Sequence, residues 1–139
     1  MPDGTIRKVA DRLAFPNGMV ITPDNGTLVI AETYGNKLTA FDIASDGSLS
    51  KSGLSRGHGL GHRRTWADLP GAYPHGICLD ADGAVWYGGV PNKRCVRVAQ
   101  SLPSREGSDV LQTISLDRGC FSCTLGGVNN ATLFMTVND

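Results

Sequence analysis

The sequence predicts an all-β protein built from repeated units, and three observations support that prediction. The chain of 139 residues contains 18 glycines and 7 prolines but few aromatic residues, which suits short strands joined by many turns. Apolar runs of strand length alternate with polar turns along most of the chain. The segment FPNGM at residues 15–19 also returns in altered form as YPHGI at residues 73–77. Each copy is a polar turn that leads into a strand.

The N-terminal residues, Gly4 to Ala10, are predicted to form a short strand, because Ile6 and Val9 follow a Pro-Asp-Gly turn. A single strand that precedes a loop and a full repeat unit is interpreted as the outer strand of a preceding unit. The sequence therefore predicts part of one more unit ahead of the first complete one.

Four strands are predicted in the first unit, residues 15–69. Its turns contain Asn next to Gly, a pair that tolerates the positive φ of tight hairpins. The apolar run LVIA at residues 28–31 is too continuous to face water, so its strand is expected to be buried on both faces. A segment rich in Gly, Ser and basic residues, 52–63, is predicted to be an inserted loop. The predicted strands are Met19–Thr22, Thr27–Glu32, Lys37–Ile43 and Arg64–Leu69.

The second unit, residues 73–116, repeats this scheme, and the third, residues 120–139, begins it again. A polar insertion at residues 101–108 precedes the last strand of the second unit. Without the two insertions the period is about 40 to 45 residues, the length of a four-stranded propeller blade. We therefore predict a single partial β-propeller domain, residues 1–139, of about two and a half blades. The predicted strands are Gly76–Leu79, Ala84–Val90, Arg94–Ala99, Asp109–Leu116, Cys120–Gly127 and Thr132–Val137.

Equivalent positions in the units predict where a site would form. Gly18, Gly76 and Cys123 are taken as corresponding points, which makes Asn17 and His75 equivalent. If the units pack side by side, these two side chains lie at matching ends of neighbouring units. They are therefore predicted to converge on one site.

The repeated turns also carry a family resemblance. The segments FPNGM (15–19), TPDNGTL (22–28), YPHGICLDADG (73–83) and DRGCF (117–121) resemble the gluconolactonase, regucalcin and luciferin-regenerating-enzyme family. The resemblance runs over nearly the whole chain and covers the later part of that family's six-bladed propeller. It implies a divalent cation, commonly calcium or zinc, at the mouth of the channel, and hydrolysis of sugar lactones or related small esters.

The resemblance also assigns site residues. Asn17 matches the family's asparagine ligand in a Pro-Asn-Gly turn, and His75 stands where the family has an aspartate that serves as metal ligand and base. His75 is thus the candidate catalytic base as well as a candidate metal ligand. The glutamate ligand from the family's first blade has no counterpart here. Because an imidazole ligand disfavours calcium, zinc or manganese is the expected metal.

Two functions remain open at this point. The first is a metal-dependent sugar-lactone hydrolase of the gluconolactonase type. The second is a non-catalytic half-propeller scaffold or binding module, in which His75 is a turn residue of a site that has lost its chemistry. In either case an incomplete ring leaves an apolar blade face open at each end. We therefore expect a homo-oligomer whose contacts cover these faces.

The balanced charge and the lack of a long apolar run argue against nucleic-acid and membrane partners. Thirteen Lys and Arg residues balance 13 Asp and Glu residues, so no net field favours nucleic acid or an anionic membrane surface. The sequence contains neither an apolar run of membrane-spanning length nor the pattern of a signal peptide. A cytoplasmic location is expected, with the four cysteines reduced.

Several shorter patterns are interpreted as structural. The G-x-S-x-G match at residues 53–57 lacks the strand and helix of a nucleophile elbow, and the Gly-rich run at 57–61 lacks those of a phosphate loop. His58 and His62 stand among helix-breaking glycines, and Cys120 and Cys123 are expected to be buried thiols. The remaining assignments are a solvated loop for Arg56, Arg63 and Arg64, packing between blades for Trp66 and Trp86, and turn stabilisation for Asp24, Asp80 and Asp82.

Overall fold

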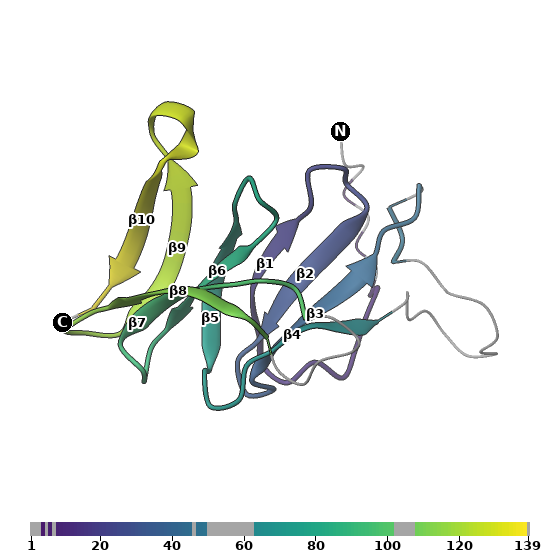
Figure 1. Ribbon diagram of the computed structural model, residues 1–139. Helices are drawn as coiled ribbons and strands as arrows, with labels where there is room; N and C mark the ends of the chain where they lie inside the picture. The colour runs from purple at the N-terminus through teal and green to yellow at the C-terminus, as the bar shows by residue number, and fades with distance from the viewer. Residues whose placement is uncertain are drawn as a thin grey trace.

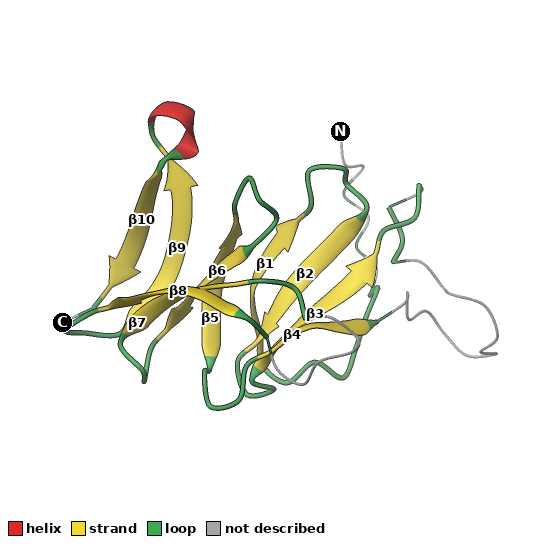
Figure 2. Ribbon diagram, in the orientation of Figure 1, coloured by secondary structure: helices red, strands yellow, loops and turns green. Residues whose placement is uncertain are grey.

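The computed structural model describes residues 4, 6, 8–45, 47–49, 63–101 and 108–138. Three antiparallel sheets follow one another along the chain, and Figures 1 and 2 show them arranged as successive blades. The only helical segment in these described ranges is a short 3₁₀ turn, η1 (Val128–Asn130). None of the described residues belongs to a helix that is long and apolar enough to span a bilayer. The prediction of an all-β fold is confirmed.

The first two sheets have four strands each, and the third has two. In each sheet every strand pairs with the one next to it in sequence. The first sheet contains β1 (Pro16–Ile21), β2 (Thr27–Glu32), β3 (Lys37–Asp42) and β4 (Arg64–Asp68). The second contains β5 (Pro74–Leu79), β6 (Val85–Gly89), β7 (Arg94–Val98) and β8 (Val110–Ser115), and the third contains β9 (Cys120–Gly126) and β10 (Thr132–Val137).

All the predicted strands from residue 19 onward are present; β2 and β10 have the predicted ends, and the others differ by one to three residues at an end. The first strands of the two complete units begin earlier than predicted, at Pro16 and Pro74. A proline is tolerated at the first position of a strand, and in both strands a bulge follows it before regular pairing resumes. The two predicted insertions fall largely outside the described residues, which exclude 50–62 and 102–107.

The expected strand at Gly4–Ala10 is wrong, since none of its described residues belongs to a strand. Val9 and Ala10, together with Leu13, instead pack against the outer face of the first sheet. Burial of these side chains on a sheet face, without backbone pairing to it, explains why a short apolar segment does not become a strand here.

Two buried clusters lie between consecutive sheets. The first and second sheets enclose Val29, Leu38, Trp66 and Val85, while the second sheet and the β9–β10 pair enclose Trp86 and the four cysteines. The run from Val29 to Glu32 is buried throughout, as its apolar sequence predicted for a strand covered on both faces. Trp66 and Trp86 serve in packing between sheets.

The first strands of the sheets approach one another backbone to backbone. A Cβ atom placed on Gly18 of β1 would lie 2.6 Å from the Ile77 nitrogen and 2.7 Å from the His75 carbonyl oxygen of β5. One placed on Gly76 of β5 would lie 2.7 Å from the Ser122 Cα of β9. Glycine is therefore required at both contacts. The contact falls at Ser122, one residue before the point that the repeat pattern aligned with Gly76.

The buried carboxylate of Glu32 connects the segment before β1 to β3 and to the residue that precedes β4. Glu32, only 1% exposed, accepts hydrogen bonds from the Ala14 amide at 2.7 Å and the Thr39 hydroxyl at 2.5 Å. It also pairs with Arg63 at 2.8 Å and faces Lys37 at 3.9 Å. Burial alone would raise the pKa of Glu32, but the hydrogen bonds and the two cations outweigh it and lower the pKa. Glu32 thus holds three segments together as an anion.

We predict that Glu32→Gln lowers the free energy of unfolding by about 2–3 kcal/mol at pH 7, because it removes the charge from a buried, paired group. Because folding lowers the pKa of Glu32 below its ordinary 4.5, this stability is present above that pH and is lost as the pH falls through the folded pKa. Urea unfolding at several pH values measures the difference, which should narrow in acid. Asp42→Asn, in a partly exposed pair with Arg64, is the control and should cost under about 1 kcal/mol. Equal losses for the two variants would contradict the assignment.

We also predict that Gly76→Ala costs on the order of 3 kcal/mol, because its Cβ would overlap the Ser122 backbone and push β9 away from β5. Gly89→Ala is the matched control, since that buried Cβ would meet the Ala72 carbonyl at an ordinary 3.4 Å. Thermal unfolding of both variants gives the comparison. A cost for Gly76→Ala no larger than for Gly89→Ala would show that the close contact is not essential.

Candidate metal and active site

Asn17 and His75 stand at the same end of adjacent first strands. Each residue directly precedes the glycine through which its strand touches the next, and Gly18 packs on the backbone from His75 to Ile77. A hydrogen-bond chain also joins the two strands, since Asn17 Nδ2 donates to Thr33 Oγ1 at 3.5 Å and Thr33 Oγ1 donates to the Pro74 carbonyl at 2.8 Å. The fold therefore brings the two predicted site residues to neighbouring positions.

The turns before Asn17 and His75 each contain an aromatic residue with a strained backbone. Phe15 has a φ of 59° and Tyr73 a φ of 49°, in the left-handed region that bulky residues avoid at a cost of about 1–3 kcal/mol each. Hydrogen bonds hold both turns, from the Thr33 amide to the Phe15 carbonyl and from the Tyr73 amide to the Asn36 side chain. The same strained backbone conformation thus recurs two residues before Asn17 and two residues before His75.

Asn17 is oriented by its amide nitrogen. Because Nδ2 donates to Thr33, the carbonyl oxygen of the side chain is the atom that remains able to bind a cation. The side chain is half-buried, so it is both held by the protein and open on one side. Thr33 itself is buried and links this amide to the strand that carries His75.

His75 is fixed by the third sheet. Its Nδ1 lies 3.0 Å from the Phe121 carbonyl oxygen, and the Phe121 ring stands edge-on to the imidazole with centroids 5.3 Å apart. A carbonyl only accepts hydrogen bonds, so Nδ1 carries the proton of this contact, and Nε2 is the ring nitrogen that the contact does not engage. A backbone carbonyl behind one ring nitrogen is the usual support of a metal-binding histidine. One nitrogen, Nε2, is thus left for chemistry.

The donor set matches a divalent cation only in part. Asn17 offers an oxygen and His75 a nitrogen, and both side chains are oriented by hydrogen bonds. Within the ranges that the structure describes, no group of three or more His, Cys, Asp or Glu side chains is placed to hold a metal ion. These two side chains would supply two ligands of a coordination shell, and the remaining ligands would have to come from water or other groups.

Glu32 and Thr33 are the residues near this site that sequence patterns did not identify. Thr33 orients Asn17, and Glu32 pairs in register with Pro16, one residue before Asn17. A signal was present in the sequence, because a carboxylate that ends a doubly buried apolar run must have partners.

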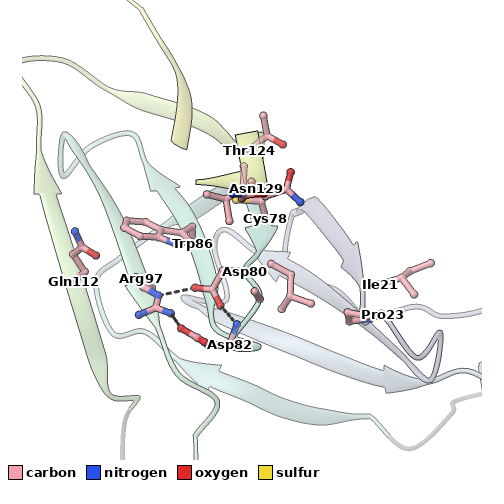
Figure 3. A pocket seen from close by; sticks show the side chains of 14 residues that line it. Ile21, Pro23, Cys78, Asp80, Asp82, Trp86, Arg97, Gln112, Thr124 and Asn129 are labelled. Atoms are coloured by element: carbon pink, nitrogen blue, oxygen red, sulfur yellow. Dashed lines mark hydrogen bonds and ion pairs between the residues drawn. The ribbon is translucent and has the colours of Figure 1, made fainter. Parts of the chain in front are cut away.

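A pocket of about 610 Å³ lies at the other end of these strands, shown in Figure 3. Asn17 and His75 are not among the residues that line it. Its charged groups compensate one another, because Arg97 pairs with Asp80 at 2.6 Å and with Asp82 at 2.7 Å. Burial would raise the pKa of Asp80, but the Arg97 contact and backbone hydrogen bonds lower it.

Two of the three turn aspartates stabilise their turns as predicted, whereas the carboxylate of Asp82 pairs with Arg97. Asp24 accepts the Gly26 amide, and Asp80 accepts the amides of Asp82 and Ala84. Cys120 and Cys123 are buried, also as predicted. The patterns at residues 53–57 and 57–61, as well as Arg56, His58 and His62, lie outside the described residues. The solvated loop expected for Arg63 and Arg64 is wrong, because Arg63 pairs with the buried Glu32 and Arg64 begins β4. The structure thus leaves Asn17 and His75 as the candidate site.

Known proteins with similar sequences include a 6-phosphogluconolactonase and a regucalcin. The 6-phosphogluconolactonase of Erwinia tasmaniensis is 28% identical over 131 residues, which are 94% of this chain and 36% of that protein. Regucalcin of Xenopus laevis is 27% identical over 139 residues, covering 97% of this chain and 41% of regucalcin. The chain therefore spans about two fifths of the length of these curated relatives.

Solved structures similar to this chain also include a gluconolactonase and a regucalcin. A gluconolactonase from Xanthomonas campestris matches with a TM-score of 0.70 at 26% identity, over 99% of this chain and 40% of that one. The calcium-binding protein regucalcin from Agrobacterium tumefaciens matches with a TM-score of 0.72 at 17% identity, over 96% and 41%. Because these neighbours are β-propellers, the fold is a partial propeller, as the repeat length predicted.

The match at the level of the family extends over the whole chain. The model of the SMP-30/gluconolactonase/LRE-like region covers residues 1–139, including both site turns and the DRGCF segment. The chain therefore belongs to the SMP-30/gluconolactonase/LRE-like family.

Proposed function

We propose that this chain contributes the Asn17–His75 half of a metal-dependent site that hydrolyses sugar lactones or related small esters. The observation that carries the proposal is the hydrogen bond from His75 Nδ1 to the Phe121 carbonyl, which occupies one ring nitrogen and leaves Nε2 as the other. The similarity to gluconolactonases supports the class of substrate. We further propose that residues 15–69, 73–116 and 120–139 act as blade units of one domain.

The roles of the two residues follow from their free atoms. Asn17 presents one oxygen, and Thr33 keeps it in place. Nε2 of His75 either binds the cation or takes the proton of an attacking water, since Nδ1 is occupied by Phe121. When bound, the cation would polarise the lactone carbonyl and lower the pKa of water. Zinc or manganese remains our proposed metal, because His75 supplies nitrogen where calcium prefers oxygen.

We predict that the chain, purified without a His-tag, binds zinc or manganese more tightly than calcium and hydrolyses gluconolactone when one of these ions is added. Asn17→Ala should weaken metal binding by roughly tenfold or more, and Thr33→Val should weaken it to a smaller extent through loss of orientation. His75→Asp should shift the preference toward calcium. Calorimetry with each ion, together with a lactone hydrolysis assay, measures these effects.

The double variant His58→Ala/His62→Ala is the control for adventitious binding, since these imidazoles are the only other histidines of the chain. It should bind and hydrolyse as the unmodified chain does. Absence of both metal binding and hydrolysis, or metal binding that persists in Asn17→Ala and His75→Ala but is lost in the control, would rule out the site.

A non-catalytic, self-associating scaffold is the second candidate, and exposed apolar side chains on the two end faces favour it. Met19 is 65% exposed and pairs in register with Ile30, so it lies on the outer face of the first sheet. Phe134 is 53% exposed and alternates along β10 with Leu133 and Met135, which pack inward. Apolar groups on both ends suit contacts with a second copy of the chain.

We predict that the chain sediments as a dimer or larger homo-oligomer. Met19→Lys or Phe134→Lys should shift it toward monomer by placing a charge on an end face. Val128→Lys, at an 83% exposed position in η1, is the matched control and should leave the mass unchanged. A stable, monodisperse monomer at all concentrations would contradict self-association without bearing on the metal site.

A further inference from the structure

All four cysteines of the chain gather in one buried cluster. Cys78 of β5, Cys95 of β7, and Cys120 and Cys123 of β9 lie between the second sheet and the β9–β10 pair. The sulfurs of Cys78 and Cys123 are 3.8 Å apart and share a thiol–thiol hydrogen bond. No metal-binding arrangement of three or more ligands occurs among the described residues, which include all four cysteines. The chemistry open to this cluster is therefore that of free thiols.

Access distinguishes one thiol from the other three. Cys78 lines the 610 Å³ pocket, and Figure 3 shows it among Trp86, Thr124 and Asn129. Cys123 lies behind it, with its sulfur 3.9 Å from the Gly76 carbonyl oxygen. Cys95 and Cys120 are fully buried and do not line the pocket. A small reagent that enters the pocket would therefore meet Cys78 first.

The hydrogen bonding of the cluster also favours Cys78 as the reactive thiol. The contact with Cys123 lowers the pKa of Cys78 against the opposing effect of burial, and the same contact raises the pKa of Cys123. Contact with Cys123 also lowers the pKa of Cys95, but that thiol has no exposed surface. Burial raises the pKa of Cys120 to about 11. Cys78 thus combines a place in the pocket wall with easier ionisation, and both favour a reactive thiol.

We propose that Cys78 and Cys123 form a reversible dithiol–disulfide pair, with Cys78 as the attacking thiol and a low-molecular-weight disulfide as the oxidant. The Cys78 thiolate attacks one sulfur of the reagent, its S–S bond breaks, and one small thiol leaves. The Cys123 sulfur, after losing its proton, then attacks the Cys78 sulfur of the mixed disulfide and expels the second small thiol. Two protein thiols are oxidised and one reagent disulfide is reduced to two thiols.

The packing of the two strands permits this bond. The sulfurs must move together by roughly 1.8 Å to reach a disulfide length of about 2.05 Å, which rotation of the two side chains can supply. The backbones of β5 and β9 are already in contact at Gly76 and Ser122, two residues from Cys78 and one residue from Cys123. The bond would join the two strands that His75 and Phe121 already connect.

The test exposes the full chain to bis(2-hydroxyethyl) disulfide, blocks the remaining thiols with iodoacetamide and maps the peptides by mass spectrometry. We expect a linked Cys78–Cys123 peptide, two small thiols released per chain, and full reversal by dithiothreitol. Cys123→Ser should stop at a mixed disulfide on Cys78 after release of one thiol, and Cys78→Ser should release none. Cys95→Ser is the matched control and should still form the bond.

The peptide map of the unmodified chain tests the Cys78–Cys123 pair directly, even where a serine variant fails to fold. Linked peptides that contain Cys95 or Cys120 in place of the proposed pair would overturn it. No linkage in the folded chain, when the urea-unfolded chain is oxidised by the same reagent, would also overturn it. A linked pair should raise the thermal midpoint in the oxidised sample, because it ties β9 to β5.

Discussion

The direct backbone contact between the first strands of successive sheets is the constraint on which the structure depends. At Gly18 and at Gly76 a side chain of any size would separate one sheet from the next. The contact fixes the spacing of the sheets, and this spacing sets the width of the two buried layers between them. It also fixes the positions of Asn17 and His75, since each stands one residue before its glycine. The site is therefore a product of the way the units stack.

The histidine illustrates how stacking and chemistry are linked. His75 belongs to the second sheet, yet its ring is oriented by a carbonyl of the third. Asn17 belongs to the first sheet and is connected through Thr33 to the strand of His75. Each candidate ligand is thus held partly by a neighbouring sheet. An isolated unit with the same turn sequence would lack this support, so the proposed site requires at least two adjoining sheets for each residue.

The sequence allowed prediction of the parts of the fold that rest on local rules. Turn residues and apolar runs located the strands from residue 19 onward, and the buried character of β2 followed from its continuous apolar run. The strand expected at Gly4–Ala10 failed because strand formation needs a pairing partner, which local pattern does not reveal. The Glu32 network and the tautomer of His75 also required the structure, since Arg63 and Phe121 are far from them in sequence.

Anchoring by Glu32 has a consequence for how this chain tolerates changes in length. On one side of residues 50–62 Leu49 bridges to Ile43, and on the other side Arg63 is held by the carboxylate and by the Arg12 carbonyl. Both ends of the intervening sequence are thus attached to the first sheet independently of its length. Doubling such a connection costs only about 0.6 kcal/mol in closure entropy. This position is therefore suited to accept inserted sequence, such as an epitope or a small domain, without displacing β3 from β4.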